Sequence, residues 1–571
     1  MFRRLIGVSI LMLLPAFAQK PAPRTQARSM VITNYGIVAT SQTLASAAGV
    51  KVLEAGGNAV DAAIAANAAL GLMEPTSNGA GGDLFAIVYE ARSKRLYGLN
   101  SSGWSPTGLT PEFVESKGNK TMPQLGILSV TVPGAVAGWD ALSRKFGRMP
   151  WQQLFRPAIQ YAEDGFPVTE RIAAGWAGFK FKSPEAVRVY LPGGKPPAAG
   201  DVFRNPLLAK TLALIANNGR DGFYKGPVAQ AIVDVSQAEG GTFTLRDLAD
   251  FEPEWVEPIS TTYRGWTVFE LPPNGQGIAA LSMLNIMENF PLASYGPNSA
   301  RALHVEIEAK KLAYADMLRY VGDPKFGKIP VDRMLGKELG AAHARQIDET
   351  KAACRVTPAD LVSMSRTPGA DTIYLTVIDR DGNMVSLIQS NYLGFGSGVV
   401  PLNTGFMLQN RGALFTLERN QPNTLAPRKR PLHTIIPAFM TKDETRISFG
   451  IMGGWNQSQA HAQFVANVVD FGMNIQAALE AARFTKLDFD GCGVDIESRV
   501  PEAVREELTK LGHVIKVLDP YSGTVGGGQA VMANAEGVHF GASDPRKDGA
   551  AAPQSPAFFT ETGKKGKGKR K

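Results

Sequence analysis

Residues 368–383 read Pro-Gly-Ala-Asp-Thr-Ile-Tyr-Leu-Thr-Val-Ile-Asp-Arg-Asp-Gly-Asn, and this stretch decides the fold. Turn-forming residues end at Asp371, an apolar run follows Thr372, and a second turn closes at Asn383. This order predicts a β-strand that begins at Thr372 and continues into a hairpin.

Thr372 is a candidate nucleophile because of its place at the start of this strand. If the chain is cleaved before Thr372, a free α-amino group with a pKa near ~8 lies beside the hydroxyl and can accept its proton. A threonine at the start of a strand more often reflects β-propensity alone. The catalytic hypothesis therefore depends on the rest of the sequence.

Further blocks along the chain support this hypothesis. They lie, in order, at residues 53–63, 74–75 with 79–83, 130–138, 430–434 and 452–454. Together with residues 372–383 they resemble the γ-glutamyltransferases (glutathione hydrolases) in the order of that family. Members of the family are N-terminal-nucleophile hydrolases that cleave themselves before a threonine.

The distribution of strand and helix patterns predicts an α+β fold. Strand patterns gather near the start of the chain and after residue 372, and the middle, about 150–360, is mainly helical. Within that middle, residues 261–271 are predicted to be a strand pair closed by Pro272-Pro273-Asn274-Gly275. The resemblance implies more: a four-layer αββα sandwich of the N-terminal-nucleophile hydrolase type, with strands from both halves interleaved. It also implies one domain made of two chains, a large subunit 19–371 and a small subunit 372–571.

The start of the chain has the pattern of a secretory signal. Residues 1–18 combine Arg3 and Arg4 with an apolar run and the small-residue site Ala16-Phe17-Ala18. We therefore expect export to the periplasm or the extracellular space. The apolar run is short for a membrane span, so no stable membrane insertion is expected, and an uncleaved anchor is the alternative.

The net charge of +8 is concentrated at the two ends of the chain. The tail 562–571 carries six of these charges, Arg3 and Arg4 carry two, and the body between them is close to neutral. This distribution argues against a nucleic-acid-binding body. The tail is expected to be a solvated, disordered end, with loose attachment to an anionic surface as the alternative.

The chain contains two cysteines, Cys354 and Cys492, without a CxxC spacing, so a zinc site is not expected. Export permits a disulfide between them, but their spacing in the sequence does not give their distance in the fold. The resemblance implies that the enzyme needs no metal and no cofactor.

The resemblance also implies a mechanism. The Thr372 hydroxyl would attack the Asp371 carbonyl, water would release the new amino terminus, and the same hydroxyl would then attack a substrate amide to form an acyl-enzyme. Gly453 and Gly454 follow a predicted strand, and a glycine pair there is either a simple turn or an oxyanion hole made of two backbone N–H groups. Thr376 shares a strand face with Thr372, so its hydroxyl either orients the nucleophile or has no catalytic duty.

Candidate substrate-binding residues fall in the blocks that build the family's pocket: Asn391, Asn410, Arg411, His433 and Thr434. The amine of Thr372 serves as the base in such enzymes, so a histidine is not required. His433 is therefore as readily a structural residue as a binding one.

Two departures from the family pattern concern the substrate. Ser102 stands about where the family has an arginine for the glutamyl α-carboxylate, and Ala413 and Leu414 stand where it has acids for the α-ammonium. A buried ammonium without a counter-charge is costly. Arg411 is a candidate replacement clamp, since a guanidinium forks onto a carboxylate.

The resulting hypothesis is a self-processing enzyme that hydrolyses or transfers a γ-glutamyl or related acyl group from amides such as glutathione. An acylase or amidohydrolase acting on glutaryl amides or oxamate is the alternative, and a non-catalytic homologue is the second. The expected partners are a small-molecule amide and the two subunits themselves, with no nucleic acid.

Overall fold

The computed structural model describes residues 26–356, 370–488 and 491–557. The predicted signal peptide 1–18 and the basic tail 562–571 lie outside these ranges. Within them, every helix is too short or too polar to cross a membrane.

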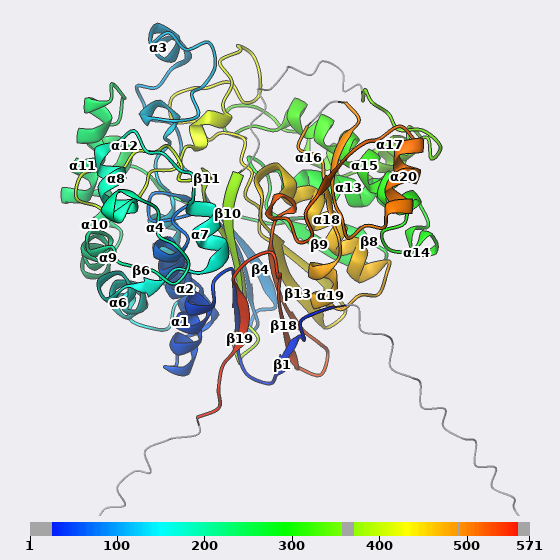
Figure 1. Cartoon of the computed structure of the whole chain (residues 1–571), viewed down its shortest axis with the longest axis horizontal. Coiled ribbons are helices and arrows are strands. Elements are labelled where there is room, and N and C mark those ends of the chain that lie inside the picture. The colour runs from blue at the N-terminus through cyan, green and yellow to red at the C-terminus, as the bar shows by residue number, and fades with distance from the viewer. Residues whose placement is uncertain (1–25, 357–369, 489–490, 558–571) are drawn as a thin grey trace, which may run out of the picture.

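Two antiparallel sheets of seven strands form the centre of the molecule (Figure 1). In spatial order the first sheet contains β19 (Ala550–Pro553), β2 (Ile37–Thr40), β10 (Ala370–Ile378), β11 (Met384–Leu393), β3 (Asp83–Glu90), β4 (Arg95–Ser101) and β7 (Glu254–Val256). The second contains β1 (Val31–Thr33), β18 (His539–Ser543), β17 (Gly528–Ala533), β13 (Thr445–Ile451), β12 (Ala438–Lys442), β9 (Trp266–Glu270) and β8 (Ile259–Tyr263).

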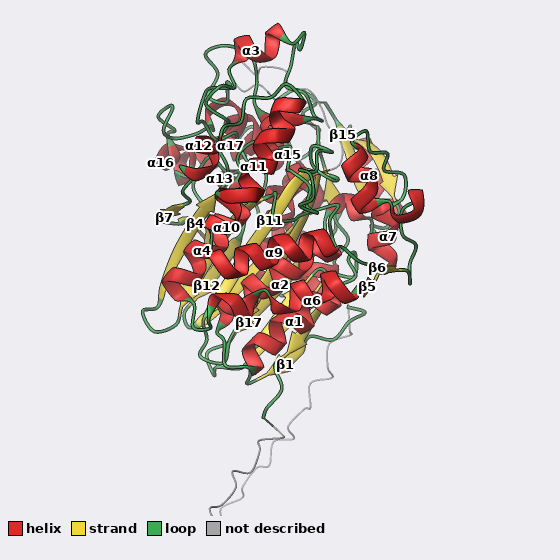
Figure 2. Cartoon of the chain, turned by 90° about the vertical axis from the view of Figure 1, so that its left-hand side faces the viewer, coloured by secondary structure: helices red, strands yellow, loops and turns green. Residues whose placement is uncertain are grey.

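Helices cover the outer face of each sheet, on the left and on the right of Figure 1. The first sheet is covered by α1 (Thr43–Glu54), α2 (Ala59–Met73) and α4 (Ala135–Phe146), which Figure 2 shows in front of the strands. The second sheet is covered by α13 (Gly277–Met287), α18 (Gln457–Val469) and α19 (Ile475–Glu480), with α15 (Ala300–Tyr320) packed on α13.

The remaining elements surround these layers. Beside α2 lie α5 (Trp151–Leu154), α6 (Arg156–Asp164), α9 (Pro206–Asn218), α10 (Asp221–Tyr224), α11 (Gly226–Ala238) and α12 (Leu245–Ala249). Beside α13 and α15 lie α14 (Leu292–Tyr295), α16 (Val331–Met334), α17 (Lys337–Ala344) and α20 (Glu502–Lys510). The short elements are α3 (Pro111–Ser116), α7 (Glu170–Trp176), α8 (Pro184–Tyr190), β5 (Phe166–Pro167) and β6 (Val202–Phe203).

Three buried apolar clusters match the three interfaces of a four-layer sandwich. One joins α1 and α2 to the first sheet, one joins α13 and α18 to the second, and a smaller one lies between the sheets. The layer between the sheets contains Phe85, Tyr374, Ile388 and Phe439. The expected αββα architecture is therefore confirmed.

Each sheet contains strands from both sides of residue 372, as expected. β10 pairs with β2 on one side and with β11 on the other, and β11 pairs with β3. In the second sheet β12 pairs with β9. Strands from each half of the chain thus hydrogen-bond to strands from the other half. Without this pairing, the strand edges would expose rows of unbonded N–H and C=O groups.

One predicted hairpin closes elsewhere. The turn between β8 and β9 is at Arg264 and Gly265, not at Pro272–Gly275. Both turn residues have positive φ, +48° and +82°, as a two-residue hairpin turn requires. Residues 272–275 instead carry the chain from β9 into α13, where Gly275 pairs with His433.

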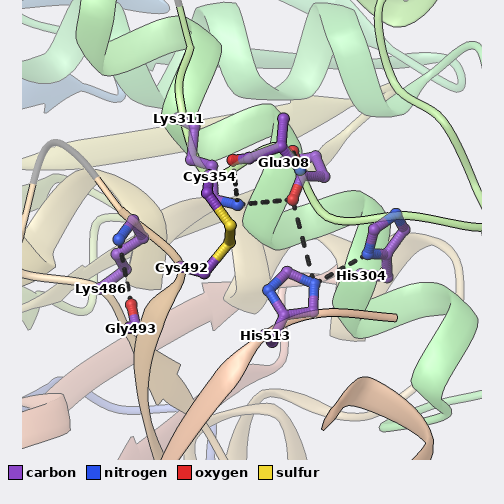
Figure 3. The surroundings of a disulfide bond; sticks show 9 residues. His304, Glu308, Lys311, Cys354, Lys486, Cys492, Gly493 and His513 are labelled. Carbon is purple, nitrogen blue, oxygen red and sulfur yellow. Dashed lines mark hydrogen bonds and ion pairs between the residues drawn. A yellow bond between two sulfur atoms is a disulfide. The ribbon is translucent and has the colours of Figure 1, made fainter. Parts of the chain in front are cut away.

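A small third sheet lies outside the sandwich. It contains β14 (Phe484–Thr485), β15 (Gly493–Glu497) and β16 (Val514–Leu518). Cys354 and Cys492 form a disulfide beside it (Figure 3). The disulfide joins a residue that precedes Thr372 to one that follows it.

Candidate active site

Thr372 lies at a break in the pairing of β10 with β11. The register shifts between Asp371 and Ile373, so that β11 contains one extra residue opposite Thr372. Such bulges re-aim side chains and are frequent next to active sites. The Thr372 hydroxyl is fully buried and donates to the Ser390 hydroxyl at 3.2 Å.

Thr376 lies on the same strand four residues further on. Its hydroxyl is 2.7 Å from that of Ser448 on β13, so this pair joins the two sheets. Between them, Tyr374 hydrogen-bonds to Ser386 at 2.7 Å. Thr372 is thus hydrogen-bonded to Ser390 and not to Thr376, whose hydroxyl is bonded to the opposite sheet.

Gly453 and Gly454 form the turn between β13 and α18. Their φ angles are +120° and +58°, a region that favours glycine. Gly454 begins a 3₁₀ turn (Gly454–Asn456) that packs against β10 and leads into the amino end of α18. Among the described residues, no backbone acceptor takes the N–H of Gly453 or Gly454. Two free donors near a helix amino terminus suit a developing negative charge.

Arg411 is fully buried and is held by two neighbours. Its Nη1 donates to the Thr434 hydroxyl at 2.7 Å, and its Nε lies 3.4 Å from a carboxylate oxygen of Asp83. The guanidinium also lies over the ring of Tyr392, 4.7 Å from the ring centre. Its Nη2 has no partner among the described residues. Burial lowers the pKa of Arg411 to about 10, so it remains charged at neutral pH.

His433 shares the same carboxylate. Its Nε2 lies 3.1 Å from Asp83, and its Nδ1 accepts the N–H of Ile435 at 3.3 Å, so the ring proton is on Nε2. Burial, with the charge of Arg411, lowers the pKa of His433 to about 4. The imidazole is therefore neutral at physiological pH and orients Asp83.

The two asparagines differ in how they are bonded. Asn410 accepts the N–H of Leu393 and donates to the Gln124 carbonyl at 2.7 Å. Asn391 is fully buried, yet neither atom of its amide has a partner among the described residues. Because buried polar groups are almost always bonded, such an amide is free to bind a ligand or water. Asn391 directly follows Ser390, so this free amide lies on the strand that faces Thr372.

Ser102 and Leu414 are both buried. Ser102 bonds to Asn100 at 2.8 Å and receives the amide of Asn274 at 3.3 Å, while Leu414 packs into the apolar core. Neither residue offers a charge.

Sequence reasoning missed Asp83 and Ser390. The hairpin register contained a signal for Ser390: Thr376 faces Ser386, and continuing that register places Ser390 opposite Thr372. Asp83 ends a glycine-rich turn within a recognised block, but its pairing with Arg411 across 328 residues of sequence has no local signal.

A separate cluster of His304, Glu308 and His513 has the residue types of a metal site (Figure 3). However, Lys311 Nζ lies 2.6 Å from Glu308, and His304 lies 2.8 Å from His513. The carboxylate is thus already neutralised by an ammonium, which disfavours a cation there. The cluster instead bonds α15 to the loop before β16.

Comparisons with known proteins agree with this geometry. Residues 45–554 match the profile of the family described as Gamma-glutamyltranspeptidase. The glutathione hydrolase-like YwrD proenzyme of Bacillus subtilis is 37% identical, over 91% of this chain and 99% of the relative. The oxamate amidohydrolase proenzyme of Klebsiella pneumoniae is 34% identical, with the same coverage. Among solved structures, the cephalosporin acylase of Bacillus halodurans has a TM-score of 0.85 and 42% identity, over 95% of this chain and 99% of the acylase. The chain therefore belongs to the gamma-glutamyltranspeptidase family of amide hydrolases and acyltransferases.

Proposed function

We propose that this chain cleaves itself between Asp371 and Thr372 and then hydrolyses a carboxylate-bearing acyl amide. The large chain would be 19–371 and the small chain 372–571. The observation that carries the proposal is the buried Thr372 hydroxyl, which is bonded to Ser390 and lies on β10, the strand that contacts the turn Gly454–Asn456.

Self-cleavage starts with the hydroxyl. Ser390 lies within hydrogen-bonding distance of Thr372 Oγ1 and orients it. Oγ1 attacks the Asp371 carbonyl carbon, the peptide C–N bond breaks, and the acyl group moves to oxygen while nitrogen gains a proton. Water then hydrolyses this ester, which leaves Asp371 with a carboxylate and Thr372 with a free amine.

The amine then serves as the base for the substrate reaction. It accepts the hydroxyl proton as Oγ1 attacks the substrate carbonyl, and it returns a proton to the leaving amine. The N–H groups of Gly453 and Gly454 stabilise the oxyanion. Water, or a second amine in transfer, attacks the acyl-enzyme by the same path in reverse.

Arg411 supports a carboxylate in the acyl group. The guanidinium has one nitrogen without a partner among the described residues, and the amide of Asn391, on the strand that pairs with β10, is also unbonded. No acid stands at Ala413 or Leu414 to receive an α-ammonium. We therefore propose glutaryl-type or other simple carboxy-amides as substrates at least as good as γ-glutamyl amides. The names of two relatives, an oxamate amidohydrolase and a cephalosporin acylase, fit acyl groups other than γ-glutamyl.

Side-by-side kinetics of glutaryl-p-nitroanilide and γ-glutamyl-p-nitroanilide test the substrate proposal. We expect kcat/KM for the glutaryl compound to equal or exceed that for the γ-glutamyl compound. A strong preference for the γ-glutamyl compound would show that other groups bind the α-ammonium. Thr372→Ala should be inactive on both.

The location of the enzyme is a further part of the proposal. The signal pattern in residues 1–18 and a disulfide, which persists in oxidising compartments, support export. Cell fractionation should recover a protein that begins at Gln19 outside the cytoplasm. Recovery of Met1 in the cytosolic fraction contradicts export.

A further inference from the structure

Gln276 lies on the loop that leads from β9 into α13, within the proposed large chain. Its side chain is fully buried. The loop is bonded to the segment before β12 that contains His433 and Thr434: Gln276 N–H donates to the His433 carbonyl at 3.0 Å, and His433 N–H donates to the Asn274 carbonyl at 2.8 Å.

The side-chain amide of Gln276 joins two parts of the site. Its Nε2 donates to the Gly454 carbonyl at 2.7 Å and also to the Thr434 carbonyl. Both acceptors are backbone oxygens, so the nitrogen must face them and the amide has one orientation. Gly454 belongs to the candidate oxyanion turn, and the Thr434 hydroxyl receives Arg411.

The Gly454 turn needs such a bond. A glycine has access to left- and right-handed backbone conformations, so its own chemistry does not hold φ at +58°. The bond from Gln276 fixes the carbonyl of Gly454, and the Tyr314 hydroxyl fixes the next carbonyl, that of Trp455, at 2.6 Å. With these carbonyls held, the N–H groups on the other side of the turn have a defined direction.

We propose that Gln276 is a positioning residue that holds the oxyanion turn against the segment of His433 and Thr434, whose Thr434 hydroxyl receives Arg411. This inference rests on the proposed function, since it takes Gly453 and Gly454 as the oxyanion hole. It assigns to the large chain a contribution to the rate of the reaction, made through the small chain's turn. Loss of the bond from Gln276 to the Gly454 carbonyl should lower kcat more than it raises KM. Arg411, which is proposed to bind the substrate carboxylate, keeps its contacts with Thr434 and Asp83 in the variant.

Gln276→Met tests this assignment, with Gln463→Met as the matched control. Gln463 on α18 is also buried and donates to two backbone carbonyls, those of Gln459 at 3.1 Å and Phe484 at 3.2 Å, but it does not contact the site. Kinetics are measured with the better of the two p-nitroanilides and normalised to the cleaved fraction. We expect Gln276→Met to lower kcat roughly ten- to a hundredfold, below the full loss of an oxyanion donor, with KM changed less than about threefold. Gln463→Met should keep kcat within about twofold.

Gln276→Glu provides a second variant of the same shape. A carboxyl group has one donor hydrogen at most and none when ionised, so it cannot donate to both carbonyls as the amide does. This variant should therefore lose activity in the same direction as Gln276→Met, and circular dichroism checks that both fold. A folded Gln276→Met chain that stays uncut, while Gln463→Met is cut, also supports the assignment. Wild-type kcat in either Gln276 variant, or an equal loss in Gln463→Met, overturns it. If Thr372→Ala retains activity, the proposed function fails instead, so the two failures are distinguishable.

Discussion

At the scale of single residues, the arrangement around Asp83 determines what the pocket can bind. Asp83 carries one negative charge and lies against both Arg411 and His433. Because His433 is neutral, the guanidinium and the carboxylate neutralise each other, and the remaining free nitrogen of Arg411 is a donor rather than a bare charge. The proposed substrate carboxylate would therefore need further donors, and the unbonded Asn391 amide is a candidate for one of them.

Arg411→Lys should weaken substrate binding more than catalysis. A lysine keeps the positive charge near Asp83 but lacks the planar fork that reaches Thr434 and the substrate together. Loss of one charge-assisted hydrogen bond costs ~1.5–3 kcal/mol. We expect KM for glutaryl-p-nitroanilide to rise by roughly tenfold or more, with a smaller change in kcat. An unchanged KM contradicts a carboxylate clamp at Arg411.

His433→Gln should change how stability depends on pH. The folded-state pKa of His433 is about 4, whereas the unfolded value is near ~6.5, so only the unfolded chain binds this proton between those values. The wild type therefore loses stability as the pH falls through that window, by up to ~1.4 kcal/mol per unit. The variant has no such group. The free energy of unfolding of the wild type, relative to that of the variant, should therefore fall by about 3 kcal/mol from pH 6.5 to pH 4.

Urea unfolding of both proteins across pH 4–8 measures this difference. Above pH 6.5 the difference should be constant. A difference independent of pH throughout the range would contradict the lowered pKa, because it would mean that the folded and unfolded chains bind this proton equally well.

The sequence predicted some of these residues and not others. Thr372 could be picked out because it opens a predicted strand, and Gly453 and Gly454 because they follow one, where a turn is expected. Arg411 was identified by its position, but its burial and its partner were not, because Asp83 comes from a strand more than three hundred residues away in sequence.

At the scale of elements, the site depends on where two strands end. The bulge in β10 and β11 turns Thr372 toward Ser390, and the turn after β13 presents two free N–H groups. The hairpin of β10 and β11 was predictable from its Asp-Gly-Asn turn. The turn of β8 and β9 was misplaced because Arg264 gives little indication of positive φ, and Pro272-Pro273-Asn274-Gly275 has the stronger turn composition. Pro157 lies in the first turn of α6, which follows α5 directly.

Gly453→Ala tests the turn as a catalytic element. An alanine is strained at φ +120°, so the substitution should distort the turn and move its N–H groups. We expect a fall in kcat of about a hundredfold, comparable to the loss of one oxyanion donor. Gly472→Ala is the matched control: its φ is +62°, no atom lies near an added Cβ, and it follows α18 away from the site. The control should lose stability without losing kcat, and an equal loss in both variants would show a general effect of strain.

At the scale of the whole molecule, two kinds of connection hold the proposed subunits together. Each sheet contains strands from both, and the Cys354–Cys492 disulfide links them covalently at the edge of the sandwich. The four layers were predictable from the family resemblance. The disulfide was not, because the 138 residues between the cysteines give no distance in space.

The disulfide should make the cleaved enzyme run as one species on a non-reducing denaturing gel and as two after reduction. In native buffer the two chains should stay together even when reduced, since the interleaved strands remain paired. Cys354→Ser should lower the free energy of unfolding by ~2–4 kcal/mol while activity is retained, because the disulfide lies outside the two sheets that hold Thr372. Two species without reductant would show that the link does not form in the mature enzyme.

The central claim is that Thr372 becomes the amino terminus of an active small chain. Amino-terminal sequencing and intact-mass measurement of the purified protein, followed over time, test it most directly. The account predicts a fragment that begins Thr-Ile-Tyr-Leu, activity that rises in step with that fragment, and a Thr372→Ala chain that stays intact and inactive. An intact wild-type chain with full activity, or a new amino terminus at another residue, would contradict it.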